Sequence, residues 1–359
     1  MKIGFIGNGW RTEGYLRVMK QVPEKFEVSG ILFRDPVKAA AFDKNYPGKT
    51  YTDIDTFLKQ DHDMIFVLLP REVVLSYVEK VLEAGFPLLL ETPPADGVEQ
   101  LVRVYELNKK YNAKIQVAEQ YFLMPYHEAV YKLVDDGVLG EVSNLRIAMC
   151  HDYHGISLMR RFLGTGMQPA SIIGREYHYP VLDHISRAGL KIGATELKED
   201  ARKVAVFQFE NGKTGFFDFA GSQYSNYFRT RHMNVQGTHG EINDYDVVYW
   251  NGEMPAYAPM LRQDTGKNLN LGGYFQRGIS WNGKFIYENP FLSFRDARLK
   301  DDEIAMAAML LGMERLIETG EEIYPLKEAL QDTYLYLMMD EAIRLDHEVR
   351  TEVMPWMED

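Results

Sequence analysis

The stretch Lys2-Ile3-Gly4-Phe5-Ile6-Gly7-Asn8-Gly9-Trp10-Arg11-Thr12 decides the fold, because a short apolar run passes directly into a glycine turn. The run Lys2–Ile6 predicts a strand, and the segment after the turn has the apolar spacing of a helix. In this position Gly7 permits a tight turn, and Gly9 lets the backbone approach a pyrophosphate at the positive end of the helix. The pattern predicts a dinucleotide-binding turn, and an ordinary strand-to-helix turn is the alternative.

Short apolar strands alternate with helix-period segments through about residue 120. Met64–Leu69 is a nearly continuous apolar run, which is typical of a strand buried on both faces. The helical segment Val98–Tyr111 separates the runs Pro87–Leu90 and Lys114–Ala118. Strands that alternate with helices pair in parallel through right-handed crossovers. Residues 1–120 are therefore predicted to form an α/β dinucleotide-binding Rossmann domain, which is a doubly wound parallel sheet.

The pattern changes after about residue 121. Lys203–Phe209 and Thr214–Ala220 alternate apolar and polar residues, and Asn211-Gly212 between them is a strong hairpin signal. A further run of period two covers Phe228–Val235. Combined with helical segments, these antiparallel strands predict that residues 121–359 form an α+β domain built on a largely antiparallel open sheet.

The composition limits the class of protein. Among 359 residues, Lys and Arg total 40 and Asp and Glu total 52, so the formal net charge is −12. No Lys/Arg cluster is present to follow a nucleic-acid backbone, and no apolar run approaches the roughly 20 residues that span a bilayer. The single Cys150 allows no internal disulfide, which predicts a reducing, cytoplasmic location. We expect neither nucleic acid nor membrane as a partner, and no ligand spacing predicts a metal site.

The end of the second predicted strand bears on the choice of cofactor. A carboxylate that holds the adenosine ribose of NAD is expected about 20 residues after the glycine turn. Phe33 occupies this place, and Arg34 and Asp35 follow it. Without the carboxylate a 2′-phosphate is not repelled, and Arg34 can pair with that phosphate or stack on the adenine. This pattern favours NADP over NAD, unless Arg34 is a surface residue paired with Asp35.

Several short fragments occur in a fixed order along most of the chain. They are Ile6-Gly7-Asn8-Gly9, Leu68-Leu69-Pro70, Glu83-Ala84-Gly85, Glu91-Thr92-Pro93, Gly137–Val142, Gly237–Ile242, Asp302–Ala305 and Tyr324–Ala329. In order and spacing the chain resembles the Gfo/Idh/MocA oxidoreductases, a family that includes glucose–fructose oxidoreductase and inositol dehydrogenase.

The resemblance implies a nicotinamide cofactor, NADP or NAD, in the N-terminal domain. It also implies that the C-terminal domain binds substrate and supports oligomerisation. A sugar, polyol or related substrate would lie between the cofactor and one face of the C-terminal sheet, and the other face would pair copies into homodimers or homotetramers. The implied cofactor contacts are Gly7, Asn8, Gly9, Trp10, Phe33, Arg34, Leu69, Pro70, Glu91 and Thr92.

Two positions depart from the family's pattern. The family's Glu-Lys-Pro triplet places a lysine beside the nicotinamide, where it assists proton transfer, whereas this chain has Glu91-Thr92-Pro93. A threonine hydroxyl forms hydrogen bonds but is no general base near neutral pH. The family's helix-opening motif supplies an aspartate and a histidine, and its best match is His154–Gly164. Ser157 stands there in place of the aspartate, so both halves of the acid/base machinery are altered.

The segment His151-Asp152-Tyr153-His154 offers a different proton-transfer group. It follows a predicted strand, and in an extended segment Asp152 and His154 share one face. Histidine titrates near neutral pH, so His154 is the candidate for taking a hydroxyl proton, with Asp152 and Tyr121 orienting it or the substrate. The alternative is a hydrogen-bonded corner at a strand end.

The sequence of residues 165–200 predicts irregular structure, and it contains Tyr177, Tyr179 and two histidines. Long loops commonly line pockets, so Tyr177–Tyr179 and Asp183-His184 are candidate substrate contacts, and a plain surface loop is the alternative.

These patterns predict an NAD(P)-dependent oxidoreductase that transfers a hydride between nicotinamide and a sugar, polyol or sugar-like substrate. Because Thr92 and Ser157 replace the family's lysine and aspartate, the alternative is a catalytically degenerate dinucleotide-binding or regulatory protein of the same fold. A third reading is transient oxidation that activates a neighbouring bond for elimination or hydrolysis.

Overall fold

The computed structural model describes residues 1–186, 189–267, 272–294 and 297–358. By their internal contacts these residues form two compact units. The first unit comprises Met1–Glu128, Arg262–Ile279 and Tyr287–Thr333, and the second comprises Ala129–Leu261, Ser280–Ile286 and Tyr334–Asp359. A domain boundary near residue 121 stays a prediction.

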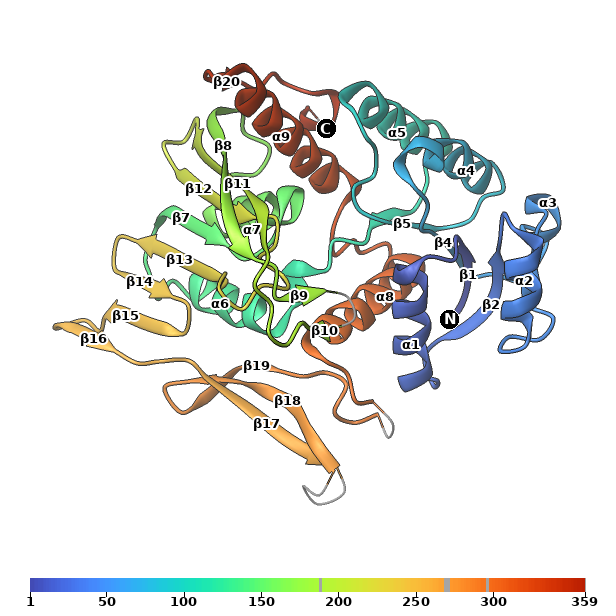
Figure 1. Ribbon diagram of the computed structural model, residues 1–359, viewed down its shortest axis with the longest axis horizontal. Coiled ribbons are helices and arrows are strands. Elements are labelled where there is room, and N and C mark those ends of the chain that lie inside the picture. Colours follow the sequence, from blue (N-terminus) through green and yellow to red (C-terminus); the bar gives the residue numbers. More distant parts are fainter. Residues whose placement is uncertain (187–188, 268–271, 295–296, 359) are drawn as a thin grey trace. The chain divides into compact units, whose positions relative to one another are not determined.

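The first unit is built on a six-stranded sheet with helices on both faces (Figure 1). Its elements are β1 (Lys2–Ile6), α1 (Trp10–Gln21), β2 (Glu27–Leu32), α2 (Pro36–Asp43), β3 (Thr50–Tyr51), α3 (Ile54–Phe57), β4 (Met64–Val67), α4 (Arg71–Glu83), β5 (Leu88–Leu90), α5 (Val98–Tyr111), β6 (Ile115–Val117), the 3₁₀ helix η1 (Tyr121–Leu123) and α8 (Asp301–Thr319).

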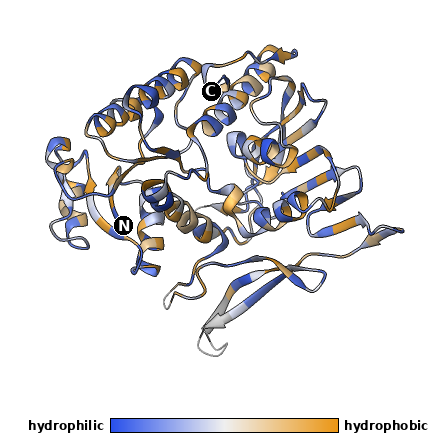
Figure 2. Cartoon of the chain, turned by 180° about the vertical axis from the view of Figure 1, so that it is seen from behind, coloured by the Kyte–Doolittle hydropathy of each residue, from blue (hydrophilic) through white to orange (hydrophobic). Residues whose placement is uncertain are grey.

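The strand order is β3-β2-β1-β4-β5-β6, and every adjacent pair is parallel. Helices α1 and α8 pack together on one face of the sheet, and α4 packs with α5 on the opposite face. This follows from right-handed crossovers, because the chain runs from β1 toward one edge of the sheet and from β4 toward the other. All residues of β4 and β5 are buried, and Figure 2 shows the strands of this sheet mostly in the hydrophobic colour. The predicted doubly wound Rossmann sheet is confirmed, with its topological switch point between β1 and β4.

The second unit is built on a nine-stranded sheet in the order β16-β15-β14-β13-β7-β12-β11-β8-β20. Its elements are α6 (Pro125–Asp135, which begins in the first unit), β7 (Val142–Ala148), α7 (Asp152–Leu163), β8 (Ala170–Leu182), β9 (Ile185–Ser186), β10 (Gly189–Leu190), β11 (Leu197–Phe209), β12 (Thr214–Ala220), β13 (His232–Gly237), β14 (Gly240–Asn243), β15 (Asp246–Trp250), β16 (Pro255–Tyr257), α9 (Leu326–Leu345, which begins in the first unit), β20 (Val349–Arg350) and the 3₁₀ helix η2 (Pro355–Met357). A separate three-stranded sheet contains β17 (Leu261–Lys267), β18 (Gly272–Trp281) and β19 (Lys284–Glu288).

Adjacent strands of the large sheet are antiparallel except for β7 and β12, which pair in parallel. Asn211 and Gly212 form the turn between β11 and β12, where Gly212 has a φ of +81°. Helix α7 packs against β7 and β12. The predicted α+β arrangement on a largely antiparallel open sheet is therefore confirmed.

The prediction of irregular structure over residues 165–200 is wrong for much of this segment. Strand β8 pairs with β11 along its whole length, from Ala170 opposite Phe209 to Leu182 opposite Leu197. Most side chains in the second half of β8 are exposed, so the sequence lacks the apolar alternation that marks a half-buried strand. The strand predicted for Phe228–Val235 likewise begins only at His232. Among the described residues, no helix combines the length and the apolar character needed to cross a membrane.

Candidate functional site

The glycine turn connects β1 to α1 at the switch point of the parallel sheet. Gly7 has a φ of +117°, and a Cβ on it would lie 2.2 Å from the carbonyl oxygen of Leu68, so only glycine fits there. Gly9 is the N-cap of α1, and a Cβ on it would have no neighbour within 4 Å. Thr12 fits the third motif position because its Oγ1 donates a hydrogen bond to the Gly7 carbonyl at 3.0 Å. Because the N-cap Gly9 has no side chain to cap α1, the first backbone N–H groups of this helix are available to an anion.

The adenosine side of the turn lies at the end of β2. Phe33 is buried against Phe42, with 5.3 Å between the ring centroids. Asp35 is the N-cap of α2, and its Oδ1 accepts a hydrogen bond from the Val37 N–H at 2.9 Å. The exposed Arg34 forms no ion pair within the described ranges. Asp35 therefore serves the helix, and the Arg34 guanidinium is accessible to a phosphate.

A buried polar cluster lies on the other side of the turn, at the carboxyl ends of β5 and β6. The Arg11 Nε donates to Glu91 Oε1 at 2.8 Å, and its Nη2 donates to Gln120 Oε1 at 3.0 Å. Only 17% of the Arg11 side chain and 18% of the Glu91 side chain are exposed. The guanidinium also lies 5.3 Å from the Trp10 ring centroid and 5.6 Å from that of Tyr15. The cluster fixes a cation next to the predicted cofactor contacts Glu91 and Trp10.

Burial and charge act together on this cluster. Burial opposes the charge of Arg11, but Glu91, Tyr15 and Tyr121 together outweigh it and raise the pKa of Arg11 above its ordinary value. Burial also raises the pKa of Glu91 despite the nearby guanidinium, and it raises the pKa of the Tyr15 phenol. Glu91 Oε2 and the Tyr15 hydroxyl are buried without a hydrogen-bond partner among the described residues. Glu91 Oε2 and the Tyr15 hydroxyl are therefore two buried polar atoms with which a bound ligand would form hydrogen bonds.

The remaining residues predicted for the first unit lie around the same strand ends. Trp10 is 74% exposed at the start of α1, whereas Asn8, Leu69 and Thr92 are half-buried. Pro70 is the N-cap of α4. The Thr92–Pro93 peptide bond is cis. Tyr121 opens η1, and its backbone N–H donates to Glu119 Oε1 at 3.0 Å.

The histidine segment of the second unit is helical rather than extended, so the predicted sharing of one face by Asp152 and His154 is wrong. His151 is the N-cap of α7, and Asp152 begins the helix with a φ of +47°. This left-handed turn brings Asp152 Oδ2 to 3.2 Å from Nδ1 of His151. Asp152 thus pairs with the histidine before it.

Distant charges hold Asp152 in place. Lys203 Nζ on β11 lies 3.8 Å from Asp152 Oδ1 and 2.6 Å from Asp340 Oδ1 on α9. Burial works against the charged form of Asp152, but the His151 hydrogen bond and the Lys203 charge together lower its pKa. Burial likewise opposes the charge of Lys203, and Asp340 and Asp152 nevertheless raise its pKa. His151, Asp152, Lys203 and Asp340 form a chain of charged and polar contacts.

The two imidazoles differ in access. Their ring centroids are 4.8 Å apart. The His151 side chain is 34% exposed, whereas His154 is buried at 6% exposure. The His151 backbone N–H donates to the Tyr224 hydroxyl oxygen at 3.1 Å, and Phe219 packs near the same ring. Ser157 is buried on α7, and the Cys150 side chain is also buried.

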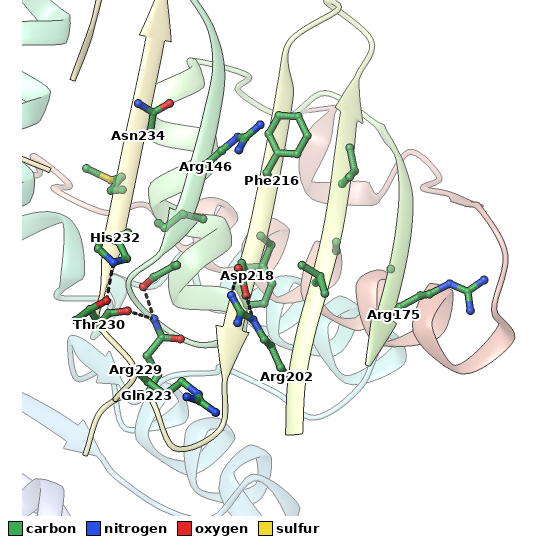
Figure 3. A pocket seen from close by; sticks show the side chains of 18 of the residues that line it. Arg146, Arg175, Arg202, Phe216, Asp218, Gln223, Arg229, Thr230, His232 and Asn234 are labelled. Atoms are coloured by element: carbon green, nitrogen blue, oxygen red, sulfur yellow. Dashed lines mark hydrogen bonds and ion pairs between the residues drawn. The ribbon is translucent and has the colours of Figure 1, made fainter. Parts of the chain in front are cut away.

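The open face of the large sheet carries a broad hollow of about 1080 Å³, shown in Figure 3. Arg146 and Phe216 contribute to it from neighbouring strands, with the guanidinium 5.1 Å from the ring centroid. Arg202 pairs with Asp218 through two hydrogen bonds. The hollow combines apolar surface with charges of both signs.

Sequence reasoning missed three residues that these clusters depend on. Arg11 carried a signal, because a cation in the first turn of a helix opposes the helix dipole and needs a local acid. Lys203 and Asp340 carried none, because 137 positions separate them and the contact joins strand β11 to helix α9.

Residues 1–119 match the family model GFO_IDH_MocA, described as an oxidoreductase family with an NAD-binding Rossmann fold. Inositol 2-dehydrogenase of Corynebacterium glutamicum (strain R) is 25% identical over 205 residues, which are 53% of this chain and 61% of that enzyme. The matched segments span 37%, 36% and 61% of the first three curated relatives.

Solved structures match over nearly the whole chain. The scyllo-inositol dehydrogenase of Lactobacillus casei with bound NAD(H) and scyllo-inositol has a TM-score of 0.64 at 15% identity, and the match covers 98% of each chain. A levoglucosan dehydrogenase in complex with NADH has a TM-score of 0.69 at 14% identity, covering 99% of this chain and 100% of that one. At these identities the likeness concerns the fold. Taken with the family match, it confirms the resemblance predicted from the sequence: residues 1–119 match the Gfo/Idh/MocA oxidoreductase family through their NAD-binding Rossmann fold.

Proposed function

We propose that this protein is an NAD(P)-dependent oxidoreductase that transfers a hydride between a nicotinamide and a CH–OH carbon of a sugar, polyol or similar substrate. The observation that carries the proposal is the glycine turn, where Gly7 allows the close approach to Leu68 and α1 begins without a side-chain cap. A dinucleotide pyrophosphate is the ligand that such a turn suits at a switch point. The relatives that act on inositol and levoglucosan support the class of substrate.

The accessible Arg34 supports NADP, because its guanidinium can pair with a 2′-phosphate where Phe33 replaces the usual carboxylate. NAD remains the alternative cofactor, since several related structures contain it. Contacts from Gly7, Gly9 and Thr92 to the dinucleotide belong to the same proposal, as does the cytoplasmic location.

The proposed proton acceptor is an imidazole of the second unit. The sequence motif favours His154, whereas the Asp152 hydrogen bond and the greater exposure favour His151. When Asp152 accepts the Nδ1–H of His151, Nε2 of that ring carries the lone pair that takes a proton, as in other carboxylate–histidine pairs. We therefore propose His151 as the acceptor, with His154 packed against it and Asp152 as the positioning residue.

The reaction then balances in one step. The substrate's hydroxyl gives its proton to the imidazole, its C–H gives a hydride, and a carbonyl forms. When bound, the nicotinamide supplies the hydride acceptor. Thr92 has no role as a base, and its hydroxyl would donate to or accept from a substrate oxygen. Tyr121 is a further candidate for substrate contact.

The test is a binding and turnover experiment. The protein is titrated with NADP and NAD by calorimetry and then incubated with each cofactor and a panel of sugars, polyols and inositols while the 340 nm absorbance is followed. We expect binding of at least one dinucleotide and a rise in absorbance with one substrate class. Absence of binding for both cofactors would overturn the proposal.

A second candidate function is dinucleotide binding without turnover. The replacement of the family's lysine by Thr92 and the burial of Ser157 on α7 favour it. It predicts cofactor binding with no hydride transfer for any substrate and no effect of His151→Gln. A Thr92→Lys variant that gains activity would support this degenerate site.

We also propose that the protein forms a homodimer or homotetramer through the open face of the large sheet. Ile173 is 54% exposed there and lies opposite the exposed Val206, and Tyr177 and Tyr179 stack beside them. Because Arg202 and Asp218 neutralise each other's charge, two copies of this face can pack together without repulsion at these residues. An exposed apolar patch of this kind is typical of an interface.

A further inference from the structure

The Arg11–Glu91 pair offers a donor and an acceptor side by side. Two of the five guanidinium N–H groups are used by the bonds to Glu91 and Gln120, so within the described residues three donors are left for water or a ligand. Glu91 Oε2 is buried and lacks a partner in the same part of the chain. A buried carboxylate oxygen without a donor is costly, so a partner is expected in the working protein.

The position of the pair narrows the identity of that partner. The pair lies at the carboxyl ends of β5 and β6, on the β4 side of the switch point. In doubly wound folds the adenosine half of a dinucleotide lies over the end of β2, on the opposite side. The half that carries the nicotinamide is therefore the part of the ligand that faces Arg11 and Glu91.

We propose that Arg11 and Glu91 together recognise the primary carboxamide of the nicotinamide ring. A guanidinium N–H of Arg11 donates to the carboxamide oxygen, and Glu91 Oε2 accepts from the carboxamide N–H. A primary carboxamide is complementary to this pair because it presents one acceptor and one donor in a plane. The inference rests on the proposed dinucleotide binding and extends it to the residues that set the ring's orientation.

The fixed geometry of the pair supports a positioning role. Gln120 and Glu91 hold two edges of the guanidinium, and the rings of Trp10 and Tyr15 flank it. A carboxamide bound by both groups cannot rotate by half a turn, because the rotated group would place its NH₂ against the guanidinium and its oxygen against the carboxylate. A ring turned over about its glycosidic bond would carry its carboxamide away from the pair, so binding at the pair also selects one face of the ring for hydride transfer.

Cofactor analogues that differ only in the carboxamide test this pairing by their dissociation constants. The probes are the preferred dinucleotide, its 3-acetylpyridine analogue, which keeps the oxygen but lacks the N–H, and its nicotinic acid analogue, which carries a carboxylate. For the unmodified protein we expect the acetyl analogue to bind about tenfold or more weakly than the parent. The acid analogue should bind more weakly still, because its carboxylate meets that of Glu91.

Two variants separate the donor from the acceptor. Glu91→Gln supplies an amide N–H, so it should narrow the gap between the acid analogue and the parent by about tenfold. Arg11→Lys should weaken the parent and the acetyl analogue by similar factors, because both keep the carbonyl that Arg11 contacts. Glu119→Gln, which changes a neighbouring buried carboxylate at the end of β6, is the matched control and should leave the ratios between analogues unchanged.

Each outcome bears on one claim. Equal binding of the parent and acetyl analogue by the unmodified protein overturns the carboxamide pairing while the proposed function stands. An unchanged ratio in Glu91→Gln, or a ratio altered equally by Glu119→Gln, also overturns it. Binding of none of the three dinucleotides overturns the proposed function itself. The series with unmodified protein decides the question even where a variant fails to fold.

Discussion

The glycine turn of the first unit and the histidine cluster of the second differ in whether backbone atoms or side chains form the site. The turn is formed by backbone atoms: Gly7 approaches Leu68 O, and under the proposed function the N–H groups that open α1 bind the dinucleotide. The cluster depends on side-chain contacts. Asp152 reaches His151 because its backbone is left-handed, and it reaches Lys203 because the fold brings β11 close to the start of α7.

This difference explains where sequence reasoning works. A site formed by backbone atoms needs a few consecutive residues, so their spacing and the placement of glycine predict it. A site formed by side chains from distant elements depends on strand register and on the path of the backbone between those elements. The sequence His151 to His154 is therefore compatible with an extended corner and with the start of a helix. These two conformations bring different side chains of the segment together.

The largest expected effect comes from placing a methyl group in the turn. Gly7→Ala should lose dinucleotide binding and destabilise the protein by about 3 kcal/mol, because it forces a side chain into a left-handed backbone and onto Leu68 O. Gly9→Ala is the matched control, since a Cβ there meets nothing within 4 Å, and it should keep the fold. Urea unfolding and calorimetric titration measure both. Equal losses of stability in the two variants would contradict the backbone account.

The histidine cluster should respond in turnover rather than in stability. His151→Gln should lower kcat by a factor of about 10² to 10⁴, the usual contribution of a positioned base, with the dinucleotide Kd unchanged. His154→Gln should cost less, because its ring is buried and acts through packing. A loss confined to His154→Gln would return the role of base to the residue that the sequence favoured.

The open sheet face should show a smaller effect, on association alone. We expect the unmodified protein to have the mass of a dimer or tetramer in light scattering, and Ile173→Asp to shift it toward the monomer, because the charge falls on the exposed apolar part of the face. Ile192→Asp changes an even more exposed isoleucine elsewhere in the second unit and should have no effect. A monomeric unmodified protein at micromolar concentration would refute the proposed interface.

The extent of sequence prediction follows the same division. Strand β1, the turn and helix α8 were predictable because burial on both faces, glycine placement and acidic residues at Asp301–Glu303 each leave a local pattern. The glycine turn therefore lies between the strand and the helix predicted for it, and its contacts to a cofactor stay a prediction. Strand β8 was not, because its outer half is stabilised by pairing with β11 rather than by burial. The contact between Lys203 and Asp340 was not predicted, because the two residues are 137 positions apart and the sequence around each gives no sign of the other.

The smallest effect concerns Asp152 and the dependence of stability on pH. Its pKa in the folded protein is lowered, so the ionised carboxylate stabilises the fold above the unfolded pKa near 3.9, and this contribution is lost as pH falls through the folded pKa. Asp152→Asn should lower the free energy of unfolding by about 1 kcal/mol at pH 7. Asparagine tolerates the φ of +47°, so the change removes charge without adding backbone strain. Urea unfolding between pH 3 and pH 8 should show the two proteins converging below about pH 4. A difference that stays constant with pH would mean that Asp152 stabilises α7 by its hydrogen bonds alone, and the charged chain through Lys203 would then have no energetic role.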